Sequence, residues 1–505
     1  MLKVIASEYI TLDSNVLSGG GTDVTEALQK ILDMAPQNNG VHLIMDGAAL
    51  VHGLKIHSNT IIECINCDCG FFMTDYANRP IISNYNWSYD EITTRNVKLI
   101  GGTYNHNCTH QVHHLPPEEF PYPVSEKENV YAASHGIFLM ELSGIENLTV
   151  DGVVFKNQRT YAFCLTNFEN VLMENITIDM ADHVHPSNQD GLHFYGPGRF
   201  LTMRNIKGCT GDDFINLAPD ELDGESSITD VLIDGIFFDD CRQGIRMLSR
   251  RNGRLDRVTI RNVTGTYRTF GFSIMPFIRD NTYGRFGDIL IENVDLRQNS
   301  ETHHYTTLSF MEIGGDIDNF TLKNVRFHSP YRKTLFIDLG RPFFYRPKEL
   351  TKEEAVRCHV DDINVFGEHI YWLPETGERP TIKNFTLDNC HIDCDEKTDD
   401  MTYISLKHTI ENLSVKNVNI YRGGNATTSG KFIKMDNEAK VKNMFLQNIY
   451  AEKLESIVSG DEEHSIDFLR ANNVILRDGG KIFDTDKVTI KSELNTEVHE
   501  IGETK

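Results

Sequence analysis

Short runs of alternating hydrophobic and polar residues recur along the chain from about residue 90 onward. Each run belongs to a phrase of two such runs separated by an Asn, Asp or Gly, as in "NLTVDGVVF", "NVLMENITI" and "DILIENVDL". A period of two predicts β-strands, because successive side chains of a strand point to opposite faces. One helical pattern stands apart, "DVTEALQKILDMA", and it predicts a helix over residues 23–35.

The two-strand phrase returns at intervals that are typical of a solenoid. The gaps between the central turn residues of successive phrases are 23, 30, 29, 28, 31 and 31 residues. Those turn residues are Gly152, Asn175, Asn205, Asp234, Asn262, Asn293 and Asn324. A β-sandwich also contains short strands, but its turns recur about every 8–12 residues. Paired strands that return once per coil, with no helix between them, predict an all-β protein with the parallel β-helix fold.

The repeat also predicts how the chain is divided. We expect residues 1–40 to form an N-terminal cap, whose helix covers the open end of the stack. Residues 41–485 are expected to form a single β-helix domain with a loop insertion at 104–134. Residues 486–505 carry no repeat and predict a polar C-terminal tail. A length of 505 residues alone would suggest about three domains, but the internal repeat favours one.

A second series of strands lies between the phrases, and their alignment predicts a row of polar side chains. The residues expected to point inward are Leu192, Ile215, Ile245, Phe272 and Leu308. The residues expected to point outward are His193, Asn216, Arg246, Ser273 and Ser309. Because neighbouring coils stack at about 4.8 Å, the outward residues would form a continuous row along one face.

Three acids stand where two of these strands begin. The alignment gives Asp190 and Asp213 the same position on successive coils, with Asp212 one residue earlier; Gln243 and Phe270 occupy this position on later coils. A single Asp at such a position is most often a turn residue. Three acids beside a polar row favour catalysis instead. Like charges this close cannot all ionise, so one carboxyl keeps a proton and can serve as a general acid beside a general base.

The charge and the apolar runs of the chain limit the classes of binding partner that we expect. A formal net charge of −24 disfavours a nucleic-acid partner, because phosphate binding needs clustered Lys and Arg. The first residues lack the basic and apolar regions of a secretory signal, and no apolar run approaches the roughly 18 residues of a membrane span. We therefore expect a cytoplasmic protein with no membrane partner, or a secreted one if a signal was removed.

The cysteines do not indicate a disulfide framework or a metal site. Ten cysteines in 505 residues are too few for a disulfide scaffold, and most lie in apolar runs, as Cys164 and Cys209 do. The stretch "CINCDC" lacks a second pair of ligands, so burial of Cys64, Cys67 and Cys69 is the favoured interpretation. We expect no metal and no cofactor.

At its three acids the chain resembles glycoside hydrolase family 28, the polygalacturonases. These are right-handed parallel β-helices of the pectate-lyase-like superfamily, and their motifs are Asn-Thr-Asp-Gly followed one coil later by Asp-Asp. Here "NQDG" matches the first, with Gln189 in place of Thr, and "GDD" matches the second. The resemblance implies that Asp212 is the general acid and that Asp190 and Asp213 activate water for inverting hydrolysis. Coil spacing by itself allows either an inverting or a retaining separation of the carboxyls.

Two further motifs of the family are missing. The family's His-Gly is Gln243-Gly244 here, and its Arg-Ile-Lys is Ser273-Ile274-Met275. In the family these basic residues hold the galacturonate carboxylate. Arg246, on the polar row, can supply a relocated cation that binds a carboxylate bidentately. We expect the substrate to contact His193, Asn216, Gln243, Arg246 and Ser273.

The loop insertion bears on the mode of action. A long loop upstream of the acids can close one end of a groove, which favours attack at a chain end. Its histidines, expected to be solvated or to contact sugar, are His106, His110, His113 and His114. Aromatic side chains such as Tyr195 and Tyr283 are candidates for stacking on sugar rings.

Three functions remain open. The leading hypothesis is a glycosidase that releases sugars from the ends of galacturonide chains. The second is a neutral-sugar glycosidase that resembles the family 110 α-1,3-galactosidases, which the missing Arg-Ile-Lys favours. The third is a non-catalytic carbohydrate-binding β-helix of the phage tailspike type, which the opening "GGGTDVTEALQKILDMA" also resembles. A pectate lyase is disfavoured, because such lyases use calcium and a basic residue as the base.

Overall fold

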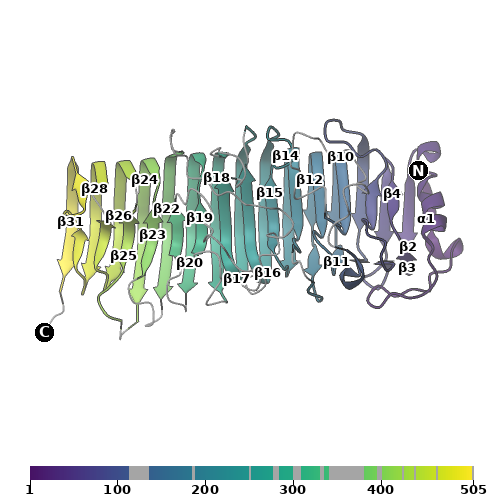
Figure 1. Cartoon of the computed structure of the whole chain (residues 1–505), viewed down its shortest axis with the longest axis horizontal. Helices are drawn as coiled ribbons and strands as arrows, with labels where there is room; N and C mark the ends of the chain where they lie inside the picture. The colour runs from purple at the N-terminus through teal and green to yellow at the C-terminus, as the bar shows by residue number, and fades with distance from the viewer. Residues whose placement is uncertain are drawn as a thin grey trace. The chain divides into compact units, whose positions relative to one another are not determined.

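The structure is a computed structural model, and the regular secondary structure of its described residues is almost entirely β-strand (Figure 1). It describes residues 1–112, 136–184, 188–249, 252–276, 284–299, 309–329, 335–339, 380–394, 401–423, 426–436, 439–461 and 464–502. These residues divide into two compact units, Met1–Cys241 and a second that begins at Arg242.

The first unit is built from short and long strands that pair in parallel from coil to coil. Its strands are β1 (Leu2–Ile5), β2 (Val41–Met45), β3 (Ala48–Val51), β4 (Leu54–Ile56), β5 (Thr60–Cys64), β6 (Gly70–Met73), β7 (Ile82–Asn84), β8 (Thr94–Ile100), β9 (Thr103–Asn105), β10 (Met140–Asp151), β11 (Val154–Lys156), β12 (Phe163–Glu174), β13 (Thr177–Asp179), β14 (Leu192–Gly208), β15 (Asp213–Ala218) and β16 (Ile228–Ser249), whose last residues belong to the second unit. In the described part of this unit, the 3-10 turns η1 (Ala6–Glu8), η2 (Pro36–Asn38) and η3 (Cys108–His110) lie between the strands.

The second unit repeats the same plan, with long strands alternating with short ones in parallel register. Its strands are β17 (Leu255–Pro276), β18 (Arg285–Gln298), β19 (Ser309–Ile313), β20 (Asp316–Ser329), β21 (Leu335–Leu339), β22 (Thr381–Cys394), β23 (Thr402–Leu406), β24 (Thr409–Arg422), β25 (Lys431–Met435), β26 (Lys440–Glu452), β27 (Ser456–Gly460), β28 (His464–Arg477), β29 (Lys481–Phe483), β30 (Val488–Ile490) and β31 (Glu493–Ile501). The predicted right-handed parallel β-helix is confirmed. That residues 41–485 form one domain stays a prediction.

The predicted capping helix is α1, which spans Thr25–Leu32 and lies against β2 and β4 (Figure 1). It is shorter than expected at its start, because Asp23 forms a β-bridge with Leu50 instead of joining the helix. The Gln29 side chain bonds both the backbone N–H and the C=O of Lys55, at 2.8 and 2.9 Å. The helix thereby satisfies polar groups at the exposed edge of β4, which is the purpose of a cap.

The recurring turn residues have a physical role in the coil. Asn175 and Asn205 adopt the left-handed conformation, with φ of 56° and 51°. Asparagine tolerates this conformation better than most residues, and its amide can pair with the same amide on the next coil. Asn205 Nδ2 donates to Asn175 Oδ1 at 2.7 Å. One predicted position was wrong by a residue, since Gly235 and not Asp234 takes the positive φ, 75°.

Strand register agrees with the alignment in the first unit and departs from it in the second. Leu192 pairs with Ile215, and His193 pairs with Asn216, as predicted. In β19, however, Ser273 pairs with Glu312, and Ser309 pairs with Phe270. Phe310 and Met311 are both fully buried, so buried and exposed residues do not alternate in this strand. Its sequence pattern therefore could not predict how it pairs with β17. Leu308 lies outside the described residues, and the alignment of Ile245 and Arg246 stays a prediction.

The C-terminal segment differs from the expected tail over residues 486–505. The strand β31 pairs in parallel with β28, from Leu469 with Glu493 to Arg477 with Ile501. Its side chains are exposed except for Val498, which is half-buried, so no buried face marked it as a strand in the sequence. Within the described residues, no helix is long and apolar enough to cross a membrane.

The cysteines mostly match their expected places. Cys64, Cys69 and Cys164 are buried thiols, and Cys209 is half-buried. Cys67 is exposed, contrary to the prediction, because it lies in the turn between β5 and β6 and not in a strand.

Candidate active site

The candidate site lies on one sheet of the first unit, which contains β7, β10, β12, β14 and β15. Its inward row is apolar and fully buried: Met140, Phe163, Leu192 and Ile215 align coil by coil. The adjacent residues on the opposite face form the row Ser83, Glu141, Cys164, His193 and Asn216. The polar row predicted from the alternation therefore exists in this unit. His193 and Asn216 on it are only 2% exposed, so the face is covered and not open to solvent.

The structure brings the three predicted acids together. The Gly191 backbone N–H donates to Asp213 O at 2.8 Å, so the turns before β14 and β15 are neighbours on successive coils. The Asp212 N–H donates to Gln189 O at 3.2 Å, which holds the second turn against the first. Asp190 and Asp213 are each 2% exposed, and Asp212 is 9% exposed.

Gln189, which stands where the family has Thr, fastens the first turn. Its side chain is fully buried, and Nε2 donates to Gln158 O at 2.8 Å and to Asp182 O at 3.1 Å. In return, Gln158 Nε2 donates to Asp190 O at 3.1 Å. The longer side chain thus ties the acid-bearing turn to the preceding coil, so the departure from the motif keeps the turn in place.

Each of two acids has a polar partner three residues further along the chain. His193 Nδ1 lies 2.9 Å from Asp190 Oδ2, and on the next coil Asn216 Nδ2 donates to Asp213 Oδ2 at 3.0 Å. The other imidazole nitrogen, His193 Nε2, lies 3.7 Å from Glu221 Oε2. The two coils therefore present the same carboxylate-and-donor pair, with a third carboxylate behind the histidine.

Aromatic rings fix the orientation of the imidazole. Tyr161 stacks on His193 with the ring centroids 4.3 Å apart and the planes at 6°. The Tyr195 ring lies 4.4 Å away on a 41° tilt. Tyr195 is fully buried and occupied by this contact, so the prediction that it stacks on a sugar was wrong.

Burial and charge shift the titration of both groups of the Asp190–His193 pair. Burial raises the pKa of the Asp190 carboxyl well above its ordinary value, and the neighbouring Asp213 carboxylate raises it further. Burial alone would lower the pKa of His193, but its hydrogen bond with Asp190 and the Glu221 carboxylate together raise that pKa to about 9. The imidazole is therefore a cation at neutral pH, held among carboxylates.

Buried acceptor atoms in the site are available to a ligand. Asp190 Oδ1 and Asn216 Oδ1 are buried and have no hydrogen-bond partner among the described residues. Buried acceptors are almost always satisfied in native proteins, by water if not by protein. These two atoms on adjacent coils are therefore suited to accept hydrogen bonds from a water molecule or a sugar hydroxyl.

Sequence reasoning missed Glu221 and Tyr161. Glu221 follows Asp220 in the stretch "LAPDEL" directly after β15, and both acids are buried. Two buried acids at the end of a strand that begins with Asp213 were the available signal. Tyr161 in "TYAFCLTN" gave none, because an aromatic residue beside an apolar strand is most often a core residue.

The remaining predicted contacts, Gln243, Arg246 and Ser273, belong to the second unit. Gln243 and Ser273 are buried there, and Arg246 is half-buried. Ser273 Oγ donates to Glu312 Oε1 at 2.7 Å. The position that carries a basic residue in the family thus faces an acid of its own unit.

Of the two loop-insertion histidines that the structure describes, His106 departs from the expected solvated role and His110 does not. His106 is fully buried, accepts a hydrogen bond from the Arg159 N–H at 3.1 Å and bonds Arg79 O at 3.1 Å. Burial lowers its pKa to about 4, so it is a neutral structural residue. His110 is half exposed. His113, His114 and Tyr283 lie outside the described residues.

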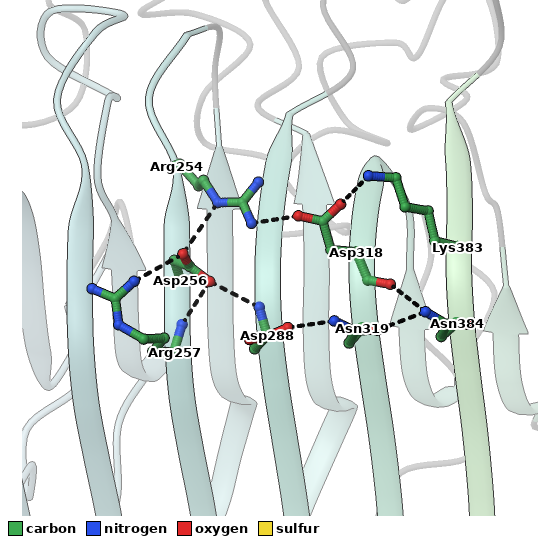
Figure 2. Close-up of a pocket in the computed structure, with 8 residues that line it drawn as sticks. All are labelled: Arg254, Asp256, Arg257, Asp288, Asp318, Asn319, Lys383 and Asn384. Carbon is green, nitrogen blue, oxygen red and sulfur yellow. Dashed lines mark hydrogen bonds and ion pairs between the residues drawn. The ribbon is translucent and has the colours of Figure 1, made fainter.

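A polar hollow in the second unit is lined by charged residues that pair with one another (Figure 2). Arg254 Nη2 and Lys383 Nζ reach the two oxygens of Asp318 at 2.5 and 2.6 Å. Arg257 pairs with Asp256 at 3.1 Å. Since each cation already has an acid beside it, this network braces neighbouring coils. Among the described residues, no group of three His, Cys, Asp or Glu side chains is arranged to hold a metal ion.

Comparison with known proteins supports the fold. No protein-family profile matches the chain, and no curated protein matches its sequence. The tailspike protein of E. coli bacteriophage HK620, solved with a pentasaccharide, is 9% identical over 95% of this chain and 77% of its own, with a TM-score of 0.52. The A-module of the Azotobacter vinelandii mannuronan C-5 epimerase AlgE6 is 11% identical over 97% and 99%, with a TM-score of 0.49. The Yersinia enterocolitica family 28 exopolygalacturonase is 13% identical over 100% and 79%, with a TM-score of 0.42. At these identities the likeness concerns the fold alone.

Proposed function

We propose that this protein is a glycoside hydrolase whose catalytic carboxyls are Asp190, Asp212 and Asp213. The observation that carries the proposal is the pairing of Asp190 and Asp213 on successive coils, each bound through Oδ2 to a donor three residues on. Hydrolysis of a glycosidic bond needs one carboxyl that gives a proton and another that takes one. Buried carboxyls that repel one another are suited to divide these roles.

The division of roles follows from the family resemblance and fits the contacts. Asp212 is proposed as the general acid that protonates the glycosidic oxygen. Asp190 and Asp213 are proposed to activate the attacking water, and the open Oδ1 of Asp190 is a suitable acceptor for that water's proton. A carboxylate with a raised pKa is also the stronger base. The stereochemical course proposed is inversion.

For the substrate we propose the ends of galacturonide chains. The site is covered, with every proposed catalytic carboxyl less than 10% exposed, which suits a pocket for a chain end better than a groove along a polymer. The imidazolium of His193 provides a positive charge in the site. Arg246 is the proposed cation for the uronate carboxylate.

One observation favours a neutral sugar as the second candidate. Ser273, at the place of the family's first basic residue, donates to the buried Glu312. A serine cannot supply the positive charge that the family uses to hold a uronate carboxylate. The missing basic motif makes an α-galactoside the alternative.

Reducing-sugar release by the purified full chain on galacturonate oligomers and on neutral α-galactosides tests both candidates. Release of single galacturonate units, with the inverted anomer seen first by proton NMR, is the expected result. If only neutral α-galactosides are cleaved, the substrate is a neutral α-galactoside and not a galacturonide. Tight binding of an oligosaccharide without cleavage would overturn the enzymatic proposal in favour of a tailspike-like binding protein.

A further inference from the structure

We propose that Glu221 is a positioning residue that acts through His193 to orient the Asp190 carboxylate and keep it ionised. This inference rests on the proposed function for its catalytic consequence and on contacts within the first unit for its geometry. Asp190 Oδ2 lies 2.9 Å from one imidazole nitrogen, and Glu221 Oε2 lies 3.7 Å from the other. The histidine therefore bridges an acid before β14 and an acid after β15.

The bridge is held rigidly. Tyr161 covers the imidazole with its ring plane only 6° from parallel, and Phe138 stacks on the other side of Tyr161 with the centroids 4.8 Å apart. A ring fixed in this way keeps Nδ1 directed at Asp190 and Nε2 on the side of Glu221. Nδ1 then binds one oxygen of Asp190, and the second oxygen, Oδ1, is left without a partner among the described residues. By holding His193, Glu221 thus helps to leave Oδ1 as the oxygen of Asp190 that can accept a proton from water.

The charges around the imidazole explain why two carboxylates are needed. Among the described residues of the first unit, the titratable groups that face His193 or its partner Asp190 are Glu221, Tyr161, Tyr195, Cys164, Asp212 and Asp213. A buried imidazolium needs compensating charge, and Asp190 alone must also face the repulsion of Asp213. With Glu221 present, the proton of the pair resides on His193, and Asp190 stays a carboxylate. Without Glu221, the form with a neutral imidazole and a protonated Asp190 gains population, and the base is lost.

The substitution Glu221→Gln tests this coupling in two ways. Nuclear magnetic resonance of ¹³C-labelled histidine follows the titration of His193, whose signal is identified by its disappearance in His193→Asn. The titration midpoint of His193 is expected to fall by about one to three pH units in Glu221→Gln, because an opposite charge near the ring is removed. The kcat near neutral pH is expected to fall, because a neutral imidazole no longer keeps Asp190 ionised, while KM changes less than kcat. Glu221→Asp is expected to restore part of both effects.

The pair His42–Glu63, on the same unit, provides the matched control. His42 Nε2 lies 2.7 Å from Glu63 Oε2, and both side chains are partly exposed. Glu63→Gln is expected to leave the His193 titration and the kcat profile unchanged. If Glu221→Gln fails to fold, His193→Asn serves instead, since its amide can still donate to Asp190 but cannot titrate. In that variant the acid limb of the kcat profile is expected to move to higher pH, because the positive charge that keeps Asp190 ionised is gone.

The outcomes separate this inference from the proposed function. An unchanged His193 midpoint in folded Glu221→Gln would overturn the positioning role, whatever the activity. A lowered midpoint in a chain that cleaves no glycoside would refute the hydrolase proposal and leave the Glu221–His193 coupling standing. A lowered midpoint with an unmoved kcat profile would show that the coupling has no part in catalysis.

Discussion

His193 and Asp190 form a hydrogen-bonded pair at 2.9 Å with both side chains at most 3% exposed, three residues apart at the start of β14. On the next coil Asn216 and Asp213 repeat the spacing at 3.0 Å. A coil of the β-helix therefore delivers one carboxylate and one donor, and stacking two coils places the carboxylates side by side.

The variant Asp212→Asn tests the proposed general acid. The amide keeps the size of the side chain but has no proton to give, so turnover is expected to fall by at least ~100-fold with an intact fold. Activity on the cleaved substrate and circular dichroism measure the two quantities. Asp90→Asn, at an exposed acid of the same unit, is the control and is expected to keep full activity. Full activity in Asp212→Asn would remove this residue from the mechanism.

The acid limb of the pH profile tests the coupling between the two neighbouring acids. Burial and the Asp213 carboxylate raise the pKa of Asp190 above its ordinary value of 3.8, so the base is protonated and lost at a higher pH than for an ordinary Asp. The acid limb of kcat/KM is therefore expected above pH 3.8. In Asp213→Asn the like charge is gone, and the acid limb of the remaining kcat/KM is expected to move to lower pH. A limb that stays in place would show that Asp213 does not influence the base.

The acid cluster could be predicted from sequence because it depends on strand period and turn residues alone. Asp190 and Asp213 share a place in two similar strands, and an alternation such as that of Leu192 and His193 fixes which face each residue occupies. Glu221 could not be placed in this way. It comes from a turn after β15, and the path of a turn back over a sheet is set by side-chain contacts and not by periodicity.

The same physics explains the register error in β19. There the consecutive Phe310 and Met311 are both buried, so burial does not alternate and one alignment fits as well as another. The exposed strand β31 was missed for the opposite reason, since it has almost no buried face. Period-based prediction succeeds in this chain where exactly one face of a strand is buried.

Gly191 allows the first acid-bearing turn to approach the second. A β-carbon at this position would lie 2.4 Å from Phe214 O and 2.7 Å from Ile178 Cδ1, and the first of these contacts is with backbone that cannot move aside easily. Gly191→Ala is expected to reduce the free energy of unfolding by about 1–3 kcal/mol and to lower activity by separating Asp190 from Asp213. Thermal unfolding and kcat measure these effects. Gly502→Ala, where a β-carbon meets nothing within 4 Å, is the control. Unchanged stability in Gly191→Ala would mean that the two turns can part without cost.

The ion network of the second unit is expected to contribute to acid stability and not to catalysis (Figure 2). Hydrogen bonds from Lys383 and Arg254 lower the pKa of Asp318 below its ordinary value of 3.8. A carboxyl with a lowered folded-state pKa stabilises the fold at pH values above its unfolded-state pKa, and this stabilisation is lost as pH falls through the folded-state pKa.

Because the side chains are partly exposed, Asp318→Asn is expected to reduce the free energy of unfolding by only about 1 kcal/mol near neutral pH. The difference from the parent chain should shrink as pH falls below about 4, when the Asp318 of the parent also becomes neutral. Urea unfolding at pH 7 and at pH 3 measures this difference, and activity on the cleaved substrate is expected to be unchanged. A loss of activity with unchanged stability would instead make this network part of a binding surface.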